Sequence, residues 1–323
     1  MKEIIKLSDV VVDYYRNGNT VRAVAGVDLT LNSGEILGLV GESGCGKSTL
    51  GKAIVGILQP SQGEITFDGQ IVKKLTRGQR PSHFRNLQMI FQDPYGSLNP
   101  RRKSGVQIAD GLLVAGMSKK NALAKAEDLL EKVGLPRAAI SRFPHQFSGG
   151  QRQRISIARA LAASPTAIIA DEPISALDTS SQAQVANLLV KLVEEFKMGM
   201  IFVSHDLSIV RRISDRVAVM YLGKIVEIGT VDQIWNNPSH PYTKALISAI
   251  PHADGNSFMP KDLPGDVPNP LSPPTGCRFH PRCQLAKPDC RISEPQLVRL
   301  SDNRDVACVL QNAGTSPNSI SLD

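Results

Sequence analysis

Three short apolar runs in the first 250 residues have the pattern of buried strands. The segments EILGLV (35–40), TAIIA (166–170) and MIFVS (200–204) are rich in branched side chains and are followed by small, polar or helix-starting residues. Continuous apolar runs of this length are typical of strands that are covered on both faces. We therefore expect each of them to be an interior strand of a sheet.

The segment 121–134, NALAKAEDLLEKVG, has a helical pattern instead. Its apolar residues recur every three or four positions, and Gly134 is a typical helix terminator. The residues on the apolar face are Leu123, Ala126, Leu129, Leu130 and Val133. Strands that alternate with helices predict an α/β fold with a mostly parallel sheet.

Proline and charge divide the chain into two unequal parts. Residues 251–323 hold 11 of the 21 prolines, which argues against long helices or central strands there. The same residues carry seven basic and eight acidic side chains, a net charge of −1, so the first 250 residues carry +8 and the whole chain +7. A basic body suits phosphates, anionic lipid headgroups or nucleic acid, or is simply a solvated surface. We place a domain boundary near Pro251.

The beginning of the chain does not look like a targeting signal. The sequence MKEIIKLSDV lacks the unbroken apolar stretch and cleavage site of a secretory signal. The chain also has no apolar run of about 18 residues, the length that a membrane helix needs. We therefore expect a cytosolic protein, in which cysteines bind metal or take part in redox chemistry rather than form disulfides.

The segment GESGCGKST (41–49) matches the phosphate-binding loop pattern G-x-x-x-x-G-K-[ST] and follows the first buried strand. Its glycines let backbone N–H groups turn toward phosphates at the start of a helix. Lys47 can reach the β- and γ-phosphates, and the Ser48 hydroxyl can bind Mg²⁺. Cys45 occupies a variable position. The expected nucleotide contacts are Gly41, Ser43, Gly44, Cys45, Gly46, Lys47, Ser48 and Thr49.

Two carboxylates follow the second buried strand. Asp171 and Glu172 are expected at the carboxyl edge of the sheet, beside the phosphates. Asp171 suits Mg²⁺, directly or through water. Glu172 points to the other side and can polarise the water that attacks the γ-phosphate.

A further glycine-rich segment, FSGGQ (147–151), leads into a helical pattern with an apolar stripe. Its serine and glycines present N–H groups at a helix start, which makes a second anion site. A phosphate loop does not need such a site unless another subunit supplies the nucleotide.

The segment Ser148-Gly149-Gly150-Gln151 resembles the signature sequence of ABC transporter ATPases, and the other motifs of that family follow in order. Tyr14, or its neighbour Tyr15, resembles the aromatic residue that stacks on adenine. Gln92 resembles the glutamine that contacts Mg²⁺ and water and senses the membrane subunits. Residues 175–178, SALD, resemble the loop that crosses the dimer interface, and His205 resembles the switch histidine that holds the γ-phosphate.

The resemblance implies an α/β fold with a mostly parallel sheet core, a helical signature subdomain at about residues 95–160 and an N-terminal antiparallel β subdomain, all within residues 1–250. It also implies that two such domains stack head to tail. Each ATP then contacts the phosphate loop of one chain and Ser148, Gly149, Gly150 and Gln151 of the other. The implied catalytic residues are Glu172 as base, His205 and Lys47, and the implied Mg²⁺ ligands are Ser48, Gln92 and Asp171.

Three further segments resemble the ATP-binding subunits of oligopeptide and dipeptide importers: FQDPYGSLNPR (91–101), SHPYTKALISAIP (239–251) and GCRFHPRC (276–283). The resemblance implies ATP hydrolysis that powers peptide import; importers of nickel, glutathione or sugars belong to the same group. The first segment is closer to F-type subunits, which work with a D-type ATPase, although a homodimer stays open. Two transmembrane permease subunits and an extracytoplasmic binding protein complete such systems. The chain would then lie peripherally on the cytoplasmic face of the inner membrane.

Four cysteines lie in the proline-rich extension at 251–323: Cys277, Cys283, Cys290 and Cys308. Four thiolates suit tetrahedral zinc or an iron–sulfur cluster. The resemblance to the peptide importers favours a [4Fe–4S] cluster, while zinc, or four thiols that simply pack, stay open. His280 is a possible substitute ligand.

Two other function classes are compatible with parts of the sequence. ABC ATPases that act on nucleic acid share the basic charge, but they usually fuse two cassettes or insert metal modules within the cassette. Here a single cassette precedes the cysteines, so no nucleic-acid partner is expected. A regulatory subunit that binds ATP without hydrolysing it does not need both Glu172 and His205.

Overall fold

The computed structural model describes residues 2–16, 18–76, 80–250 and 265–312. The boundary expected near Pro251 lies outside the described residues. Within them, no helix combines the length and the apolar character that crossing a bilayer requires.

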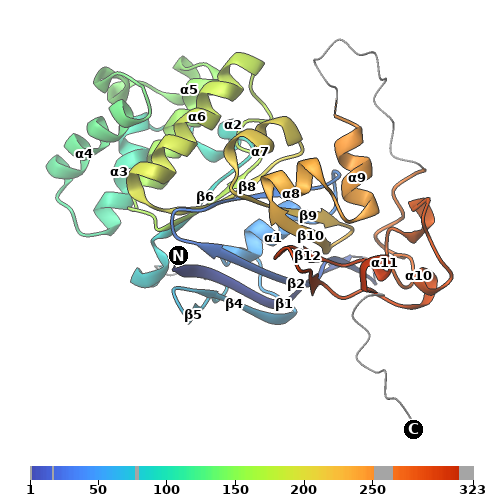
Figure 1. Ribbon diagram of the computed structural model, residues 1–323. Coiled ribbons are helices and arrows are strands. Elements are labelled where there is room, and N and C mark those ends of the chain that lie inside the picture. Colours follow the sequence, from blue (N-terminus) through green and yellow to red (C-terminus); the bar gives the residue numbers. More distant parts are fainter. Residues whose placement is uncertain (1, 17, 77–79, 251–264, 313–323) are drawn as a thin grey trace, which may run out of the picture.

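The N-terminal part of the chain forms an antiparallel sheet. Its strands are β1 (Glu3–Arg16), β2 (Asn19–Asn32), β4 (Gln62–Phe67) and β5 (Gln70–Ile71). The order is β2-β1-β4-β5, and every neighbouring pair is antiparallel. The long first strands contain many β-branched residues, which suit extended pairing. This sheet lies at the bottom of the molecule in Figure 1.

The main sheet contains the strands that the apolar runs predicted. These are β3 (Ile36–Val40), β7 (Ala167–Asp171) and β8 (Gly199–Val203), and every residue in them is buried. They run parallel to β6 (Leu87–Ile90) and β9 (Arg216–Tyr221) in the order β6-β7-β8-β3-β9. The predicted α/β fold with a mostly parallel core is confirmed.

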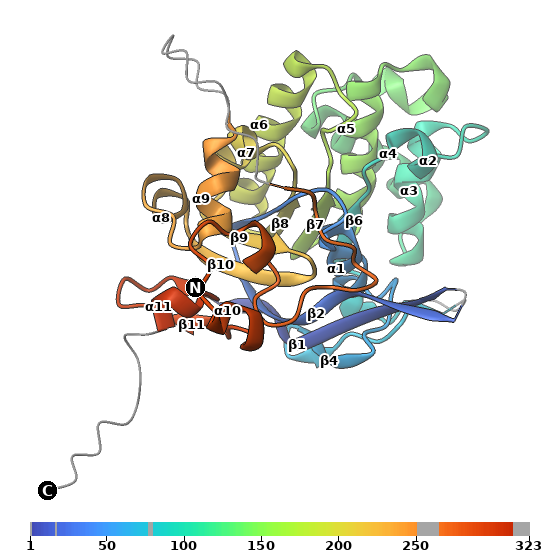
Figure 2. The same cartoon turned by 90° about the vertical axis from the view of Figure 1, so that its right-hand side faces the viewer.

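Helices cover the main sheet on the side away from the antiparallel sheet, and one helix lies between the two sheets (Figures 1 and 2). The helix between the sheets is α1 (Lys47–Ile54). The others in the first 250 residues are α2 (Pro94–Ser97), α3 (Ser104–Val114), α4 (Lys119–Lys132), α5 (Gly149–Leu161), α6 (Thr179–Phe196), α7 (Leu207–Ile213), α8 (Val231–Asn236) and α9 (Pro241–Ser248), with short 3₁₀ turns at Ser82–Phe84, Arg137–Ser141 and Pro144–Gln146. The helix predicted from residues 121–134 is α4. It buries Ala126, Leu129 and Leu130, and Gly134 follows it with a φ of 76°.

Two hydrophobic clusters hold these layers together. One joins the main sheet to the helices, with Ile155 of α5 and Phe202 of β8 fully buried in it. The other joins the main sheet to the antiparallel sheet around α1 and includes Leu39, Leu50 and Phe67. The parallel strands are therefore packed on one face against the helices and on the other against α1 and the antiparallel sheet.

The C-terminal extension continues the main sheet rather than forming a separate core. The strand β10 (Lys224–Thr230) is antiparallel to β9 and pairs on its other edge with β12 (Asp305–Val306), which pairs in turn with β11 (Val298–Arg299). The remaining elements are a 3₁₀ turn at His280–Arg282 and the short helices α10 (Asp289–Ile292) and α11 (Val309–Asn312). So small a segment buries little apolar surface by itself, and its packing against the cassette supplies the missing core.

Candidate nucleotide-binding site

The phosphate-loop segment connects β3 to α1 and requires glycine at two positions. Gly41 has a φ of 150° and Gly46 a φ of 109°, both unfavourable for other residues. A Cβ at Gly41 would come within 2.1 Å of the Met220 carbonyl oxygen, and one at Gly46 within 2.2 Å of the Ala23 carbonyl oxygen. The backbone can therefore turn its N–H groups into the loop only with these glycines.

Lys47 is held inside the loop. Its ammonium donates to the carbonyl oxygens of Gly41 at 2.7 Å and of Glu42 at 2.9 Å, and the residue is only 5% exposed. These carbonyl contacts keep the positive charge at the place where phosphates would bind.

Ser48 and Asp171 form a pair of oxygen donors at the start of α1 and the end of β7. The Ser48 hydroxyl donates to Asp171 Oδ1 at 2.7 Å, and Asp171 is 4% exposed. Burial raises the pKa of Asp171, while the Ser48 hydrogen bond and nearby Lys52 oppose that rise. A hydroxyl beside a carboxylate is a donor set that fits Mg²⁺.

Glu172 lies at the centre of a second group. Its Oε2 accepts from Gln92 Nε2 at 3.1 Å and lies 3.3 Å from Nδ1 of His205. Gln92 comes shortly after β6, Glu172 directly after β7, and His205 shortly after β8. Because β6, β7 and β8 are parallel neighbours, residues that follow them meet at one edge of the sheet.

These groups face one cavity of about 610 Å³, a volume adequate for a nucleotide's phosphates and more. The residues that line the cavity are Ser43, Gly44, Gly46, Lys47, Ser48, Thr49, Gln92, Glu172 and His205. The structure thus brings together most of the residues expected to contact nucleotide and to act in catalysis.

Three expected nucleotide contacts lie outside the cavity lining. Tyr14 is 39% exposed with its hydroxyl 3.3 Å from that of Thr49, whereas the neighbouring Tyr15 is 78% exposed. Cys45 is 3% exposed, and its thiol lies in the hydrophobic cluster around α1. Its Sγ lies 3.7 Å from the ammonium of Lys47, and Cys45 is not among the residues that line the cavity. Gly41 lies at the base of the loop, where its carbonyl oxygen holds Lys47.

The signature segment caps α5 instead of lining this cavity. The Ser148 hydroxyl accepts from the N–H of Gln151 at 3.3 Å, and Gln151 Oε1 accepts from the N–H of Ser148 at 3.1 Å. None of the described residues 148–151 is among those that line the cavity. Residues 175–178 end at Asp178, which caps α6 and whose pKa is lowered to about 2, first by the Ser180 hydroxyl. One chain therefore does not bring both anion sites to the same nucleotide.

The four cysteines of the extension are free and lie near one another. The pKa of Cys277 is raised to about 11, first by burial and also by the proximity of the other three thiols. The N–H of Cys277 also donates to the Cys290 carbonyl oxygen at 2.8 Å. Among the described residues, however, no three His, Cys, Asp or Glu side chains are arranged to hold a metal ion. The thiols are the right donors for a cluster, but their arrangement does not support the expected [4Fe–4S] centre. His280 Nδ1 bonds to the Cys277 carbonyl oxygen at 3.0 Å instead.

One contact of the phosphate loop was missed by the sequence patterns. Arg282 of the extension forms a two-pronged ion pair with Glu42, with N–O distances of 2.7 and 3.0 Å. The hydroxyl of Tyr242, in α9, accepts from the N–H of Glu42 at 3.0 Å. Because 240 residues separate Glu42 from Arg282, no local spacing signals this pair.

The fold and this site define a phosphate-loop ATPase of the ABC type. Residues 24–175 match the family described as "ABC transporter", and residues 226–290 match "Oligopeptide/dipeptide transporter, C-terminal region". The dimeric ADP- and phosphate-bound structure of the ATP-binding cassette MJ0796 superposes with a TM-score of 0.64 at 28% identity, over 71% of this chain and 99% of that one.

Curated relatives match over almost the full length. The di/tripeptide transport ATP-binding protein DppF of Pseudomonas aeruginosa is 48% identical, over 89% of this chain and 90% of its own length. The oligopeptide transport ATP-binding proteins OppF of Escherichia coli and AppF of Bacillus subtilis are both 47% identical, each over 92% of this chain and over 90% and 92% of their own lengths. The chain belongs to this family of ATP-binding subunits of oligopeptide and dipeptide ABC transporters.

Proposed function

We propose that this chain hydrolyses ATP at the cavity above the phosphate loop and thereby powers the import of di- or oligopeptides. The observation that carries the proposal is the placement of Glu172 between Gln92 and His205 at the edge of that cavity. The peptide cargo is proposed because relatives that match about nine-tenths of the chain are named for peptide transport. Nickel, glutathione and sugars are the alternative cargoes.

The proposed reaction is transfer of the γ-phosphoryl group of ATP to water. Glu172 accepts the proton of the attacking water, and Lys47 and His205 stabilise charge on the γ-phosphate. Bound Mg²⁺ neutralises phosphate charge. Ser48, Asp171 and Gln92 are its proposed ligands. Tyr14 is the proposed adenine contact, because its hydroxyl already lies beside Thr49 of the loop.

The partner that completes the site is proposed to be a second ATPase subunit of the D type, stacked head to tail. The support is that Ser148, Gly149, Gly150 and Gln151 form a helix start that the chain's own cavity does not use. The N–H groups of Gly149 and Gly150, which the reciprocal cap of Ser148 and Gln151 does not use, are then available to the γ-phosphate of a nucleotide on the other subunit.

Two transmembrane permease subunits are the proposed membrane partners, with this chain peripheral on the cytoplasmic face. A second hollow of about 360 Å³ supports this proposal, since it is lined by Phe91, next to Gln92, and by Gln107 and Gly111 of α3. A permease segment bound there would contact the residue that precedes Gln92. The proposed division of the chain is an ATPase domain at 1–250, with its helical subdomain at about 95–160, and an extension at 251–323.

We also propose that Cys277, Cys283, Cys290 and Cys308 bind a [4Fe–4S] cluster, or zinc in its place. The support is that all four cysteines are free and that Cys283, Cys290 and Cys308 are near enough to Cys277 to raise its pKa; the described side chains would have to move closer together to hold the metal. The test is iron, acid-labile sulfide and zinc analysis after anaerobic purification. The expected result is about four iron and four sulfide per chain, lost in Cys283→Ser. One zinc per chain would identify zinc as the metal instead. A chain without metal would rule out a metal site at these cysteines.

The function is tested by uptake of labelled peptides in cells that lack this chain. Uptake is expected to return with the wild-type gene and not with Glu172→Gln, because loss of the base lowers hydrolysis by about 10²–10⁴-fold while ATP still binds. Peptide uptake that is unchanged by the deletion would sink the peptide assignment. Parallel uptake of nickel, glutathione and sugars would then identify the cargo class.

A further inference from the structure

The extension and α9 together hold one residue of the phosphate loop by its side chain and its backbone. The carboxylate of Glu42 accepts two hydrogen bonds from Arg282, and its N–H donates to the Tyr242 hydroxyl. Its carbonyl oxygen accepts from the ammonium of Lys47. The residue that holds Lys47 is thus itself held from outside the loop.

The ion pair between Arg282 and Glu42 is largely shielded from water. The side chain of Arg282 is 4% exposed and that of Glu42 is 19% exposed. The Glu42 side chain does not line the nucleotide cavity and turns toward the extension. A charge in such a place needs its partner, because an uncompensated buried charge is strongly unfavourable.

An aromatic cluster gives Arg282 a rigid base. The ring centroids of Tyr221 and Tyr242 lie 4.6 Å apart, and Phe279 lies 5.3 Å from each of them. Tyr221 ends β9, Tyr242 lies in α9 and Phe279 belongs to the extension. The guanidinium of Arg282 lies 5.9 Å from the centroid of the Tyr221 ring. The cluster therefore restricts where Arg282 can be.

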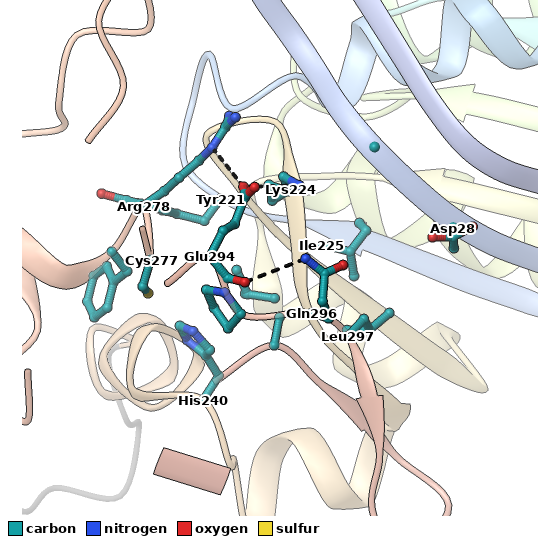
Figure 3. A pocket seen from close by; sticks show the side chains of 15 residues that line it. Asp28, Tyr221, Lys224, Ile225, His240, Cys277, Arg278, Glu294, Gln296 and Leu297 are labelled. Atoms are coloured by element: carbon teal, nitrogen blue, oxygen red, sulfur yellow. Dashed lines mark hydrogen bonds and ion pairs between the residues drawn. The ribbon is translucent and has the colours of Figure 1, made fainter. Parts of the chain in front are cut away.

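Ion pairs beside this cluster also join the extension to β10. Figure 3 shows the charged ends of Arg278 and Lys224 on either side of the Glu294 carboxylate. All three residues line a small cavity of about 60 Å³. Glu294 lies 3.0 Å from the ammonium of Lys224 in β10 and 3.8 Å from Arg278. Arg278 also bonds to the Leu222 carbonyl oxygen. The cavity has room for a few waters, and beside it Glu294 ties the extension to β10.

We infer that Arg282 is a positioning residue of the nucleotide site: through its ion pair with Glu42, the C-terminal extension holds the phosphate loop in the shape that binds ATP. The inference rests on the proposed role of this loop in binding and hydrolysing ATP. Arg282 also neutralises a carboxylate that would otherwise repel the triphosphate.

The test is the Kd of the full-length chain for ATP with Mg²⁺, measured by calorimetry in Arg282→Gln. The Kd is expected to rise at least about fivefold, the lower end of typical coupling between sites. The rise should shrink at high salt, because salt screens the unpaired Glu42 charge from the phosphates. Arg299→Gln is the matched control, since Arg299 lies in the same extension but pairs with Asp305 at 62% exposure.

Rescue separates this role from a loss of folding. The double variant Glu42→Gln/Arg282→Gln leaves no unpaired charge, and its two amides can still hydrogen-bond across the contact, so its Kd is expected to return toward the wild-type value. Should Arg282→Gln not fold, Arg282→Lys, which keeps the charge and loses the planar fork, is expected to show a smaller rise in Kd.

Two results would overturn the inference: an unchanged Kd in folded Arg282→Gln, or equal rises in Arg282→Gln and in the double variant. The proposed function is judged separately, by hydrolysis in the wild-type chain with its partner ATPase. A wild-type chain that binds ATP without hydrolysing it would sink that function and leave the Kd comparison intact.

Discussion

The backbone of Glu172 is in the left-handed region, with a φ of 44°. For an L-residue this conformation costs about 1–2 kcal/mol, and such costs concentrate at functional sites. The N–H of Glu172 donates to the Val203 carbonyl oxygen at 3.0 Å, which ties the turn to β8. The strain is thus maintained by the neighbouring strand, and it aims the carboxylate at Gln92 and His205.

This strain predicts different stabilities for two variants that both lack the carboxylate. Glu172→Gly is expected to be more stable than Glu172→Ala by about 1 kcal/mol, because glycine adopts this φ without cost. Urea unfolding of both variants measures the difference, and ATP hydrolysis should be lost in both. An alanine variant as stable as the glycine variant would show that the conformation is not strained.

His240 is a buried neutral histidine that begins α9. It is 1% exposed, burial lowers its pKa from 6.5 to about 3, and its Nδ1 accepts from the N–H of Tyr242 at 3.0 Å. The charged groups beside it are Glu227, which accepts from the His240 N–H at 2.9 Å, and Arg304, which pairs with Glu227. Tyr242, which contacts the phosphate loop through its hydroxyl, is therefore held at its backbone N–H by an uncharged imidazole.

The lowered pKa of His240 predicts a loss of stability in acid. Above pH 6.5 both the folded and the unfolded imidazole are neutral; below it the unfolded chain binds the proton first, so the free energy of unfolding falls toward pH 3. The slope from this group is about 1.4 kcal/mol per pH unit. His240→Asn keeps a helix-capping acceptor and should flatten the curve between about pH 4.5 and 6.5. An unchanged slope in the variant would contradict the assignment.

At the scale of elements, the start of α5 has two roles that can be separated. Ser148 and Gln151 form a reciprocal cap within the chain, and the N–H groups of Gly149 and Gly150 between them are proposed to face the partner's nucleotide. A capping side chain satisfies donors that a helix cannot pair by itself. The helix start is therefore stable without nucleotide and already shaped for an anion.

Two substitutions of Ser148 are expected to separate stability from activity: one lowers the free energy of unfolding, and the other abolishes ATP turnover in a stable chain. Ser148→Ala should lower the free energy of unfolding by about 1 kcal/mol, because it removes the cap. Ser148→Asp keeps a capping acceptor and should stay within about 0.5 kcal/mol of the wild type. ATP turnover should nevertheless be lost in Ser148→Asp, because its carboxylate repels the γ-phosphate. Normal turnover in the aspartate variant would place the nucleotide elsewhere.

At the scale of the whole molecule, one chain carries two anion sites that do not share a cavity. This chain and its D-type partner are therefore expected to close on ATP, and Glu172→Gln should trap the closed pair, since ATP binds and is not consumed. Size-exclusion chromatography of both subunits with MgATP measures this as a mass equal to their sum, which should be absent without nucleotide. A second substitution, Ser148→Asp, should weaken the pair. Separate subunit masses at every concentration would contradict this pairing, and a doubled mass of this chain alone would show a homodimer instead.

Much of the ATPase was predictable from local patterns. The strands β3, β7 and β8, the loop at 41–49 and the carboxylates that follow β7 depend on short stretches whose periodicity, glycines and caps act within a few residues. The α4 helix ends just before Gly134 for the same reason. Such signals are written in neighbouring residues, so the sequence alone was sufficient for them.

The tertiary structure decided what distant residues do together. It brought the side chains of Gln92 and His205 to the carboxylate of Glu172. It buried Cys45 in the hydrophobic cluster around α1 and paired β12 of the extension with β10. It also joined Arg282 to Glu42 across 240 residues. No period or motif encodes such contacts, because they depend on the relative placement of packed elements. The sequence by itself determined the class of site, whereas only the folded chain showed that the extension contacts the phosphate loop.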